Sequence, residues 1–523
     1  MTLLTRTVKQ SGNLALKNLF HQANASPKST FASVDLLDQY ECKHFKAMPG
    51  PGGLHAIPYI GMAFHMYPFT QYNSQEIHKI LDSLHDRYGP TFRMEFLGKS
   101  VVTEEPDHME VIIRNEGKYP ARAPVELFDE YAKNNNQERG MSLVNGPEWH
   151  RVRSATQQHL LKPHSAAVYV GAQAAVANDL ITRMSKITYT PEEFRNELFQ
   201  YATESIGVVA FNKRLGFMAP DGSSLSTENA NYITAIQTFF ALFYEDIGLS
   251  LYKVYPTKLY RRFEKVAKEA YGYGRAHIRE AMARFDREIR EGTFDPEEPN
   301  LILQLQAHPN MKEGSVEAIM LDLLTAGTDS TAKNVEFLLL SLALNPSKQQ
   351  TLYEEIVDVI GPKGSPILAD HMTKMAYYRS CMKESFRLNF PLPFGTLRVL
   401  PKDVMIGDYL VPKGTVAVCN NRRLLLNSEY FESPSEFLPE RWMRYGTNKK
   451  RDKDYPGVAL LPFGFGLRKC IGRRFAEQEL WLAVTKILQN FKVTVSEEDR
   501  NYEIIYTTFG QVKKPINFTF KPR

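Results

Sequence analysis

A long apolar stretch in the second half of the chain constrains the fold more than any other feature. Helical spacing of apolar residues predicts one helix over residues 312–344. At about 1.5 Å per residue, the stretch Met311–Leu344 is roughly 50 Å long, and Asn345-Pro346 marks its end. Because this helix is apolar nearly all round, we expect it to be buried. The chain therefore needs a large helical body around it.

Helical patterns dominate the remainder of the chain, and strand signals are few. Helices are predicted over residues 75–88, 147–162, 165–186, 228–247, 259–291, 346–360 and 472–490. A hairpin is expected at Val404–Val418, where two runs of strand-forming residues flank turns with glycine and proline. The fold class is therefore mainly α, with small antiparallel sheets.

The N-terminal segment differs from the rest in composition. Residues 1–34 contain four Lys or Arg residues and no acid, and the first acid is Asp35. This composition, with frequent Ser, Thr and Asn, is typical of a mitochondrial transit peptide, and the alternative is a disordered basic tail. A glycine–proline cluster follows at 48–53, after which no linker or repeat is apparent. We therefore predict a leader over 1–45 and one large domain over 46–523.

Composition excludes several classes of protein. The formal net charge of +5 is mild and gives no case for a nucleic-acid partner. No run of about 18 apolar residues occurs, so neither a membrane-spanning helix nor a secretory signal is predicted. The cysteines, Cys42, Cys381, Cys419 and Cys470, form no CxxC pair, which disfavours a zinc site or a disulfide framework and favours an intracellular protein. Three of them are interpreted as small buried apolar side chains.

Cys470 is the exception, because it lies in a glycine-rich loop directly before a predicted helix. The glycines of residues 462–472 permit a tight loop and close approach of the backbone to a flat ligand. Backbone N–H groups and the helix dipole at this position favour a thiolate. Phe463 can shield the sulfur from water, and Arg468 supplies a fixed cation suited to a carboxylate. The loop therefore predicts a thiolate site beside a flat anionic ligand.

These residues match a known family at every fixed position. Phe463, Gly466, Arg468, Cys470 and Gly472 fit FxxGxRxCxG, the haem loop of the cytochromes P-450, and the chain resembles that family. The resemblance implies that Cys470 is the proximal ligand of haem b iron, in a large α-rich fold with haem between the long helix and the cysteine loop. In such proteins the thiolate favours O–O cleavage. The alternative is a glycine-rich loop with a buried cysteine.

A Glu–Arg pair precedes this loop in the chain. Glu384 and Arg387 are three residues apart on a predicted helix and share a face. They resemble the family's ExxR motif, and Arg441 matches its third partner. The resemblance implies a buried cluster that supports the cysteine loop, whereas the alternative is an exposed pair of little energetic worth.

The middle of the long helix has an unusual sequence for a buried segment. Small residues at 326–327 precede an acid and hydroxyl residues at 328–331, and this run resembles the family's AGxDTT pattern. The resemblance implies that Asp329 and Ser330, with Thr331 beside them, relay protons to dioxygen, while Gly327 lets the helix open over haem. Ser330 stands where threonine is usual. The alternative is a helix crossing that needs small residues.

Several basic residues are candidates to bind the haem propionates. Trp149 and Arg153 lie one helical turn apart and match the family's WxxxR motif. Arg122 is a weaker candidate. Arg398 is another, although it lies one residue further from Arg387 than the family's spacing, which a one-residue insertion would explain.

Within the family, three features resemble the mitochondrial branch: the acid-free leader, the absent anchor and a basic pair before Glu384. Arg379 and Lys383 are one turn apart, and they resemble the cations with which that branch docks an acidic 2Fe-2S ferredoxin. The resemblance implies electrons from NADPH through ferredoxin reductase and ferredoxin. It also implies a location on the matrix side, peripheral to the inner mitochondrial membrane. The alternative is a solvated helix edge.

The expected activity is hydroxylation of a small lipophilic substrate. Steroids, sterols and secosteroids are the substrates that the resemblance favours. Foreign lipophilic compounds are an alternative, as are a non-redox isomerase and a haem-binding sensor or carrier. Segments 120–140 and 215–255 are expected to line the pocket, and the aromatic residues 239–244 with Ile247 form either a lipophilic lid or core.

Overall fold

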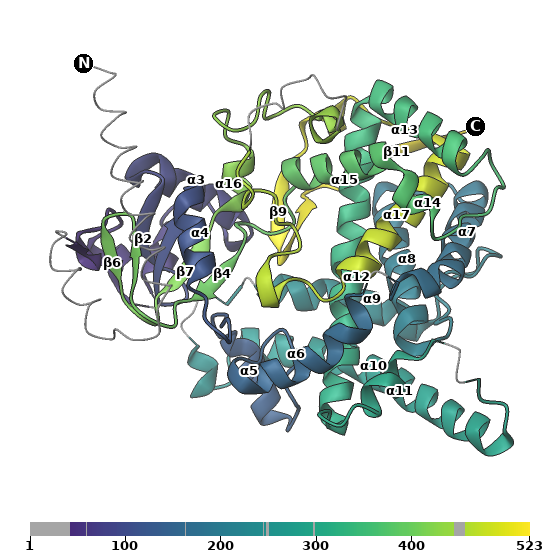
Figure 1. Ribbon diagram of the computed structural model, residues 1–523, viewed down its shortest axis with the longest axis horizontal. Coiled ribbons are helices and arrows are strands. Elements are labelled where there is room, and N and C mark those ends of the chain that lie inside the picture. Colours follow the sequence, from purple (N-terminus) through teal and green to yellow (C-terminus); the bar gives the residue numbers. More distant parts are fainter. Residues whose placement is uncertain are drawn as a thin grey trace, which may run out of the picture.

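The computed structural model describes residues 42–58, 60–162, 164–243, 245–246, 250–295, 299–443 and 455–523. Helices form one large body, two of the small sheets lie at one side of it, and the strands near the C-terminus lie in its middle and among the helices on the opposite side (Figure 1). The predicted fold class is thus confirmed. Residues 1–41 of the predicted leader lie outside the described residues, so its role stays a prediction.

The long central helix was predicted within one residue at its start and is α12 (Glu313–Leu344). Buried side chains of α12 join those of its neighbours in the largest hydrophobic core. The other α-helices are α3 (Ile77–Tyr88), α4 (Pro106–Arg114), α5 (Glu126–Asn134), α6 (Gly146–Leu160), α7 (Val170–Lys186), α8 (Pro191–Phe211), α9 (Thr227–Phe243), α10 (Lys258–Glu291), α11 (Leu301–Gln306), α13 (Pro346–Val359), α14 (His371–Lys374), α15 (Ala376–Leu388), α16 (Asn421–Leu425) and α17 (Arg473–Asn490).

Helix α8, which packs along α12, was not among the predicted helices. Its residues are buried on nearly every side, so no apolar stripe reveals its period. Its start nevertheless carries a signal. Thr190 Oγ1 accepts a hydrogen bond from the Glu193 N–H, and the Glu193 carboxylate accepts one from the Thr190 N–H, which is a capping box before Pro191.

The strands form small mixed or antiparallel sheets. Their orders are β1-β6-β5, β2-β3-β7-β4, β8-β11 and β9-β10. The strands are β1 (Lys43–His44), β2 (Thr91–Glu95), β3 (Lys99–Thr103), β4 (Leu397–Val399), β5 (Val404–Ile406), β6 (Tyr409–Val411), β7 (Val416–Cys419), β8 (Phe491–Val495), β9 (Ile504–Thr507), β10 (Phe509–Val512) and β11 (Phe518–Pro522).

The predicted hairpin at Val404–Val418 is wrong in its pairing. Strand β5 pairs with β6 across the tight turn at Gly407, whose φ of 57° suits glycine. Strand β7 instead lies in another sheet, parallel to β3 and antiparallel to β4. All its residues are buried, as in a central strand with both faces covered, which explains why it does not alternate like a hairpin edge.

The described chain begins inside the folded body. Lys43 and His44 pair in parallel with Tyr409 and Leu410 of β6, and Phe45 is buried beside them. These residues belong structurally to the domain, whereas the boundary at residue 45 remains a prediction from sequence. Among the described residues, no helix has both the length and the apolar character needed to cross a membrane.

Candidate active site

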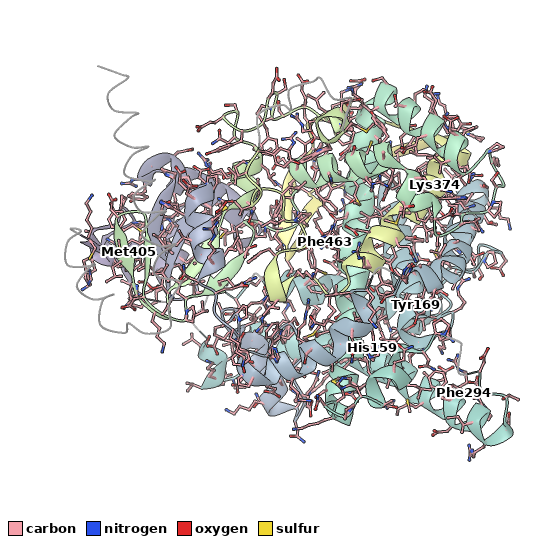
Figure 2. The ribbon with its side chains drawn as sticks, viewed as in Figure 1. His159, Tyr169, Phe294, Lys374, Met405 and Phe463 are labelled. Carbon is pink, nitrogen blue, oxygen red and sulfur yellow. The ribbon has the colours of Figure 1, made fainter. Side chains whose placement is uncertain are left out.

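The loop that carries Cys470 is held in a tight conformation before α17. The Cys470 N–H donates to the Phe463 carbonyl over 2.7 Å. Gly464 and Gly466 have φ of 66° and 63°, a region that favours glycine. A Cβ on Gly466 would also lie 2.6 Å from a Glu116 carboxylate oxygen, so any side chain there would require Glu116 to move. Figure 2 shows Phe463 near the middle of the molecule.

The Cys470 side chain lies deep in the protein and yet has accessible surface. Open space must therefore adjoin it inside the molecule. Burial raises the pKa of its thiol, whereas a hydrogen bond from the Gly472 N–H and the positive charges of Arg153 and Arg122 act in the opposite direction. The surroundings thus favour a thiolate once a cationic ligand compensates its burial. Of the three cysteines interpreted as buried, Cys381 and Cys419 are buried and burial raises the pKa of both thiols, whereas Cys42 is exposed.

Four predicted basic residues converge on the cysteine loop. Their guanidinium groups bind loop carbonyls or neighbouring oxygens, as the following contacts show: Arg153 Nη2 to Lys469 O at 2.8 Å, Arg122 Nη2 to Arg468 O at 3.3 Å, Arg398 Nη2 to Phe465 O at 3.3 Å, and Arg468 Nη2 to Asn145 Oδ1 at 2.6 Å. The Arg468 guanidinium also stacks 4.0 Å from the Trp149 ring centre. The structure therefore brings all the predicted propionate residues together.

This cluster carries more positive than negative charge. Glu116, which binds Arg398 Nε at 2.7 Å, is the acid in direct contact with it among the described residues. Burial and mutual repulsion lower the pKa of Arg468 to about 9, and burial together with a neighbouring cation lowers the pKa of Arg122 and of Arg153 to about 10. All remain charged at neutral pH. The cluster is therefore incomplete without an anion.

The residues fit haem, the group that the sequence predicts. The buried Nε of Arg153 has no hydrogen-bond partner among the described residues, so it is an open donor in this cluster. A flat group with two carboxylates would supply the missing charge and acceptors, while its metal would meet the Cys470 thiolate. Phe463, whose ring lies between Phe386 and the Arg473 guanidinium, screens this side from solvent.

One face of α12 borders the same space. Ala326 is exposed, and Asp322 and Ser330, four residues to either side, are half-buried, although most residues of α12 are buried. The Arg122 charge acts on both Cys470 and Asp322, so these groups lie around one region. The Ser330 hydroxyl, on this face, donates to Ala326 O over 2.8 Å. Ser330 therefore lies on the face of α12 that carries Asp322 and Ala326, the face expected to border the haem site.

The other two predicted relay residues point away from that face. Asp329 is fully buried, and its Oδ2 lies 2.7 Å from Lys333 Nζ. Thr331 Oγ1 donates to Glu479 Oε2 on α17 over 3.0 Å. Burial raises the pKa of Glu479 to about 8, so Thr331 contacts a largely protonated acid. The structure does not bring Thr331 to Ser330, because consecutive helical residues face about 100° apart.

Gly327 has a packing role in the structure. A Cβ at this position would lie 2.9 Å from Ile206 Cγ1 of α8, and α12 continues without interruption through residues 326–331. The expected opening of the helix at Gly327 is therefore not present. The geometry supports the alternative, a helix crossing that requires a small residue.

The Glu384 cluster forms a buried hub behind the cysteine loop. Both Glu384 and Arg387 are inaccessible to solvent. The Glu384 carboxylate accepts from Arg387 Nε at 3.0 Å and Nη2 at 2.8 Å, and from Arg441 Nε at 3.0 Å. It also accepts from the Leu438 N–H at 3.0 Å and from Trp442 Nε1 at 2.8 Å. The contact with Trp442 was missed, although its position beside Arg441 was a usable signal.

The predicted ferredoxin cations differ in their surroundings. Lys383 is exposed, and its Nζ lies 5.8 Å from the centre of the Trp442 ring. Arg379 is half-buried, and its Nη1 donates to the carbonyls of Met372 and Thr373 at the end of α14. Arg379 therefore also stabilises local structure, whereas Lys383 presents its charge at the surface of α15.

The aromatic residues predicted as lid or core lie on α9. Phe239 stacks on Phe263 of α10 and packs against Phe128 of α5, which makes it core. Phe240 packs against Phe509 of β10 with ring centres 5.9 Å apart. Tyr244 and Ile247 lie outside the described residues.

The site brings a cysteine in a glycine loop and four guanidinium groups together near a long central helix, as the predicted haem-thiolate site requires. A family model described as Cytochrome P450 matches residues 51–521, so the chain belongs to the cytochrome P450 family, a class of monooxygenases. The family resemblance of the sequence is therefore confirmed.

Relatives match over most of the chain. The "Probable cytochrome P450 12a5, mitochondrial" of Drosophila melanogaster is 30% identical, over 83% of this chain and 84% of the relative. The "Probable cytochrome P450 49a1" of the same organism is 29% identical, over 91% and 82%. The "1,25-dihydroxyvitamin D(3) 24-hydroxylase, mitochondrial" of Rattus norvegicus is 29% identical, over 96% and 94%.

Proposed function

We propose that this protein is a mitochondrial monooxygenase that takes electrons from an acidic 2Fe-2S ferredoxin and hydroxylates a lipophilic secosteroid, steroid or sterol. One observation carries the haem assignment that this function needs. An accessible cysteine sulfur lies inside the protein beside four guanidinium groups, and Glu116 is the one carboxylate in direct contact with them among the described residues. Haem supplies activation of dioxygen when it is bound there.

The residues of the chain have separate tasks in this proposal. Cys470 binds the iron, and Arg122, Arg153, Arg398 and Arg468, with Trp149 stacked on the last, hold the propionates. Ser330 can accept a hydrogen bond near the reacting oxygen, and can donate one once its hydroxyl leaves the Ala326 carbonyl, while Asp329 behind it holds or moves a proton. Thr331 supports this helix through Glu479 and takes no direct part.

The electron donor and the compartment follow from surface charge and from the relatives. Lys383 on α15 lies one turn from Arg387 of the hub behind the cysteine loop, so a donor bound there would approach the thiolate side of haem. An acidic ferredoxin complements this cation and Arg379. The basic leader and the mitochondrial names of two relatives support import into the matrix.

The substrate class is supported by one relative in particular. The rat relative is named for a secosteroid, 1,25-dihydroxyvitamin D(3), and matches 96% of this chain. A monooxygenase of foreign compounds is the second candidate, and the insect relatives, whose printed names give no substrate, leave it open.

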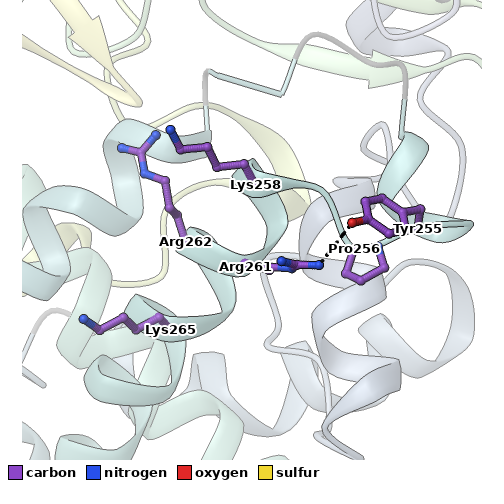
Figure 3. Close-up of a pocket in the computed structure, with 6 residues that line it drawn as sticks. All are labelled: Tyr255, Pro256, Lys258, Arg261, Arg262 and Lys265. Atoms are coloured by element: carbon purple, nitrogen blue, oxygen red, sulfur yellow. Dashed lines mark hydrogen bonds between the residues drawn. The ribbon is translucent and has the colours of Figure 1, made fainter.

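We propose further that the connection between α9 and α10 contacts the inner membrane. Leu251, Val254 and Tyr255 are large apolar side chains that are exposed there, Val254 at 93%. A pocket of about 470 Å³ beside them is lined by Tyr255, Pro256, Lys258, Arg261, Arg262 and Lys265 (Figure 3). Apolar side chains next to cations suit a surface of anionic lipid.

A binding screen tests the substrate assignment. Holoprotein is titrated with vitamin D3, 1,25-dihydroxyvitamin D3, cholesterol, progesterone and a synthetic insecticide, and the spectral shift of haem is followed. A saturable shift with one sterol-derived compound, and its hydroxylation when NADPH, ferredoxin and ferredoxin reductase are added, is expected. A shift and turnover with the insecticide alone would favour the second candidate.

The Cys470→Ala variant tests the site itself. Loss of the red-shifted absorption band of the reduced carbon monoxide complex is expected, with haem retained by the guanidinium groups. A band unchanged from that of the wild type would refute Cys470 as the ligand.

A further inference from the structure

Lys333, a residue that no sequence motif singled out, is buried behind Asp329 in the middle of α12. Its Nζ lies 2.7 Å from Asp329 Oδ2 and 2.9 Å from Thr507 Oγ1, at the end of β9. A buried ammonium group is costly unless oxygen atoms surround it. Two acceptors from distant parts of the chain thus meet at one lysine.

Burial and the 2.7 Å contact between Lys333 Nζ and Asp329 Oδ2 act in opposite directions on the charges of this pair. Burial raises the pKa of Asp329 and lowers the pKa of Lys333, and each partner opposes the shift of the other. Thr507 donates its own hydroxyl hydrogen to Gln511 Oε1 at 3.2 Å, so its lone pairs are left for Lys333. The nearest other charges, Arg195 and Glu336, pair with each other at 3.0 Å and largely cancel.

The second oxygen of Asp329 is open. Oδ1 is buried and has no hydrogen-bond partner among the described residues. An unpaired buried acceptor is costly, so the site is built to receive a donor that the described residues do not supply. Because Ser330 follows directly and faces the predicted haem site, a water between the two residues would complete the acceptor.

We propose that Lys333 is a positioning residue of the proton relay: it keeps Asp329 a carboxylate and holds Oδ2, so that Oδ1 stays open toward the Ser330 side. This proposal depends on the proposed role of Asp329. Under this proposal, Lys333 contacts neither the substrate nor haem. Its role is to fix the charge and the direction of the acid.

The turn after β9 anchors the pair from outside the helix. Thr508 has φ of 77°, and its Oγ1 donates to the Phe240 carbonyl of α9 at 3.2 Å. Phe240 also packs on Phe509. The turn that binds Lys333 through Thr507 is therefore fixed on the helix that carries the predicted pocket aromatics. The acid is held by contacts that extend to the pocket wall.

Infrared spectroscopy of the holoprotein tests the charge directly, because a protonated carboxylic acid has a carbonyl stretch that a carboxylate lacks. At neutral pH, Lys333→Met should gain one such band. The band should be absent from the Lys333→Met/Asp329→Asn double variant, and Lys333→Arg, the matched control that keeps the charge, should not gain it. Identical spectra for Lys333→Met and the double variant would overturn the proposal.

The wild type decides the matter if Lys333→Met does not fold. The difference spectrum between wild type and Asp329→Asn should contain a carboxylate band and no protonated carbonyl. A protonated carbonyl that disappears in Asp329→Asn would overturn the proposal.

A kinetic arm separates this proposal from the role of Asp329. Basal NADPH oxidation with a 2Fe-2S ferredoxin and its reductase is measured in H₂O and D₂O. Lys333→Met and Asp329→Asn should slow it to a similar extent, with no further loss in the double variant and partial recovery in Lys333→Arg. If Asp329→Asn oxidises NADPH like wild type, the relay role of Asp329 is wrong, while the infrared bands still test Lys333. If Asp329→Asn is slow but Lys333→Met is normal, Lys333 is not a positioning residue.

Discussion

Glu384→Gln is the substitution whose effect the structure defines best. It preserves shape and removes one charge from a carboxylate that is inaccessible to solvent. The native carboxylate accepts five hydrogen bonds, from Arg387, Arg441, Trp442 and the Leu438 N–H. We expect a large loss of stability without direct contact between the changed atoms and the haem site.

The magnitude follows from those contacts. If the new amide oxygen takes the place of Oε1, its NH₂ group takes the place of Oε2 and faces two donors, Arg387 Nε and Trp442 Nε1. Two hydrogen bonds to a charged group are lost, at about 1.5–3 kcal/mol each. Breaking a buried ion pair gives a similar figure, about 3–5 kcal/mol. We therefore expect the free energy of unfolding to fall by about 3–5 kcal/mol.

Guanidinium denaturation followed by circular dichroism measures this change at matched haem content. Glu110→Gln is the matched control, because the Glu110–Arg114 pair has a similar distance of 2.8 Å but is exposed. Loss of the Glu110–Arg114 ion pair should change the free energy of unfolding by no more than about 0.5 kcal/mol. The carbon monoxide complex of Glu384→Gln should also contain more of the form without thiolate ligation.

Equal unfolding midpoints for the two glutamine variants would refute this explanation of the Glu384 cluster. Such a result would mean that Arg387 holds residues 425–436 without the Glu384 carboxylate, through its hydrogen bonds to the carbonyls of Leu425, Pro434 and Glu436.

Other expected outcomes follow from single features. Burial raises the pKa of Glu479 to about 8, so the folded protein keeps a proton on Glu479 that the unfolded chain releases. The free energy of unfolding should therefore fall as the pH rises from about 4.5 toward about 8. Unfolding midpoints of Glu479→Gln should depend less on pH across that range. Lys383→Glu should raise the ferredoxin concentration needed for half-maximal turnover, and most strongly at low salt. Turnover driven by an oxygen donor that bypasses ferredoxin should be unchanged. An equal loss of turnover with that donor would argue against ferredoxin docking at Lys383. Residues 1–45 fused to a fluorescent reporter should direct it to mitochondria, and a diffuse cytosolic signal would exclude the leader.

Local sequence predicted the parts of the fold that local forces determine. The helices α10, α12 and α17 appear near their predicted bounds because their length and spacing leave no competing structure. Strand β7 was assigned the wrong partner, since pairing depends on which distant strand reaches it. Helix α8 was missed because burial on nearly every side removes the apolar stripe.

The same division holds for the site. Motif spacing identified the residues that meet around Cys470 and Glu384, because fixed spacing on short segments survives folding. Lys333 and Glu479 were missed, although each contacts a motif residue. Lys333 lies one turn after Asp329, but its partner Thr507 is more than 170 residues away along the chain. Only the tertiary arrangement shows that these groups meet.

The excess of buried guanidinium charge has a consequence for the maturation of the protein. A newly made chain must bring four like charges together around Glu116 before any cofactor neutralises them, and like charges at close range oppose compaction. Cofactor capture then releases that repulsion, so its binding energy adds to the free energy of folding. Completion of this core and acquisition of the cofactor are thus one thermodynamic event. A shortage of haem would reduce the amount of folded protein before it limited any reaction.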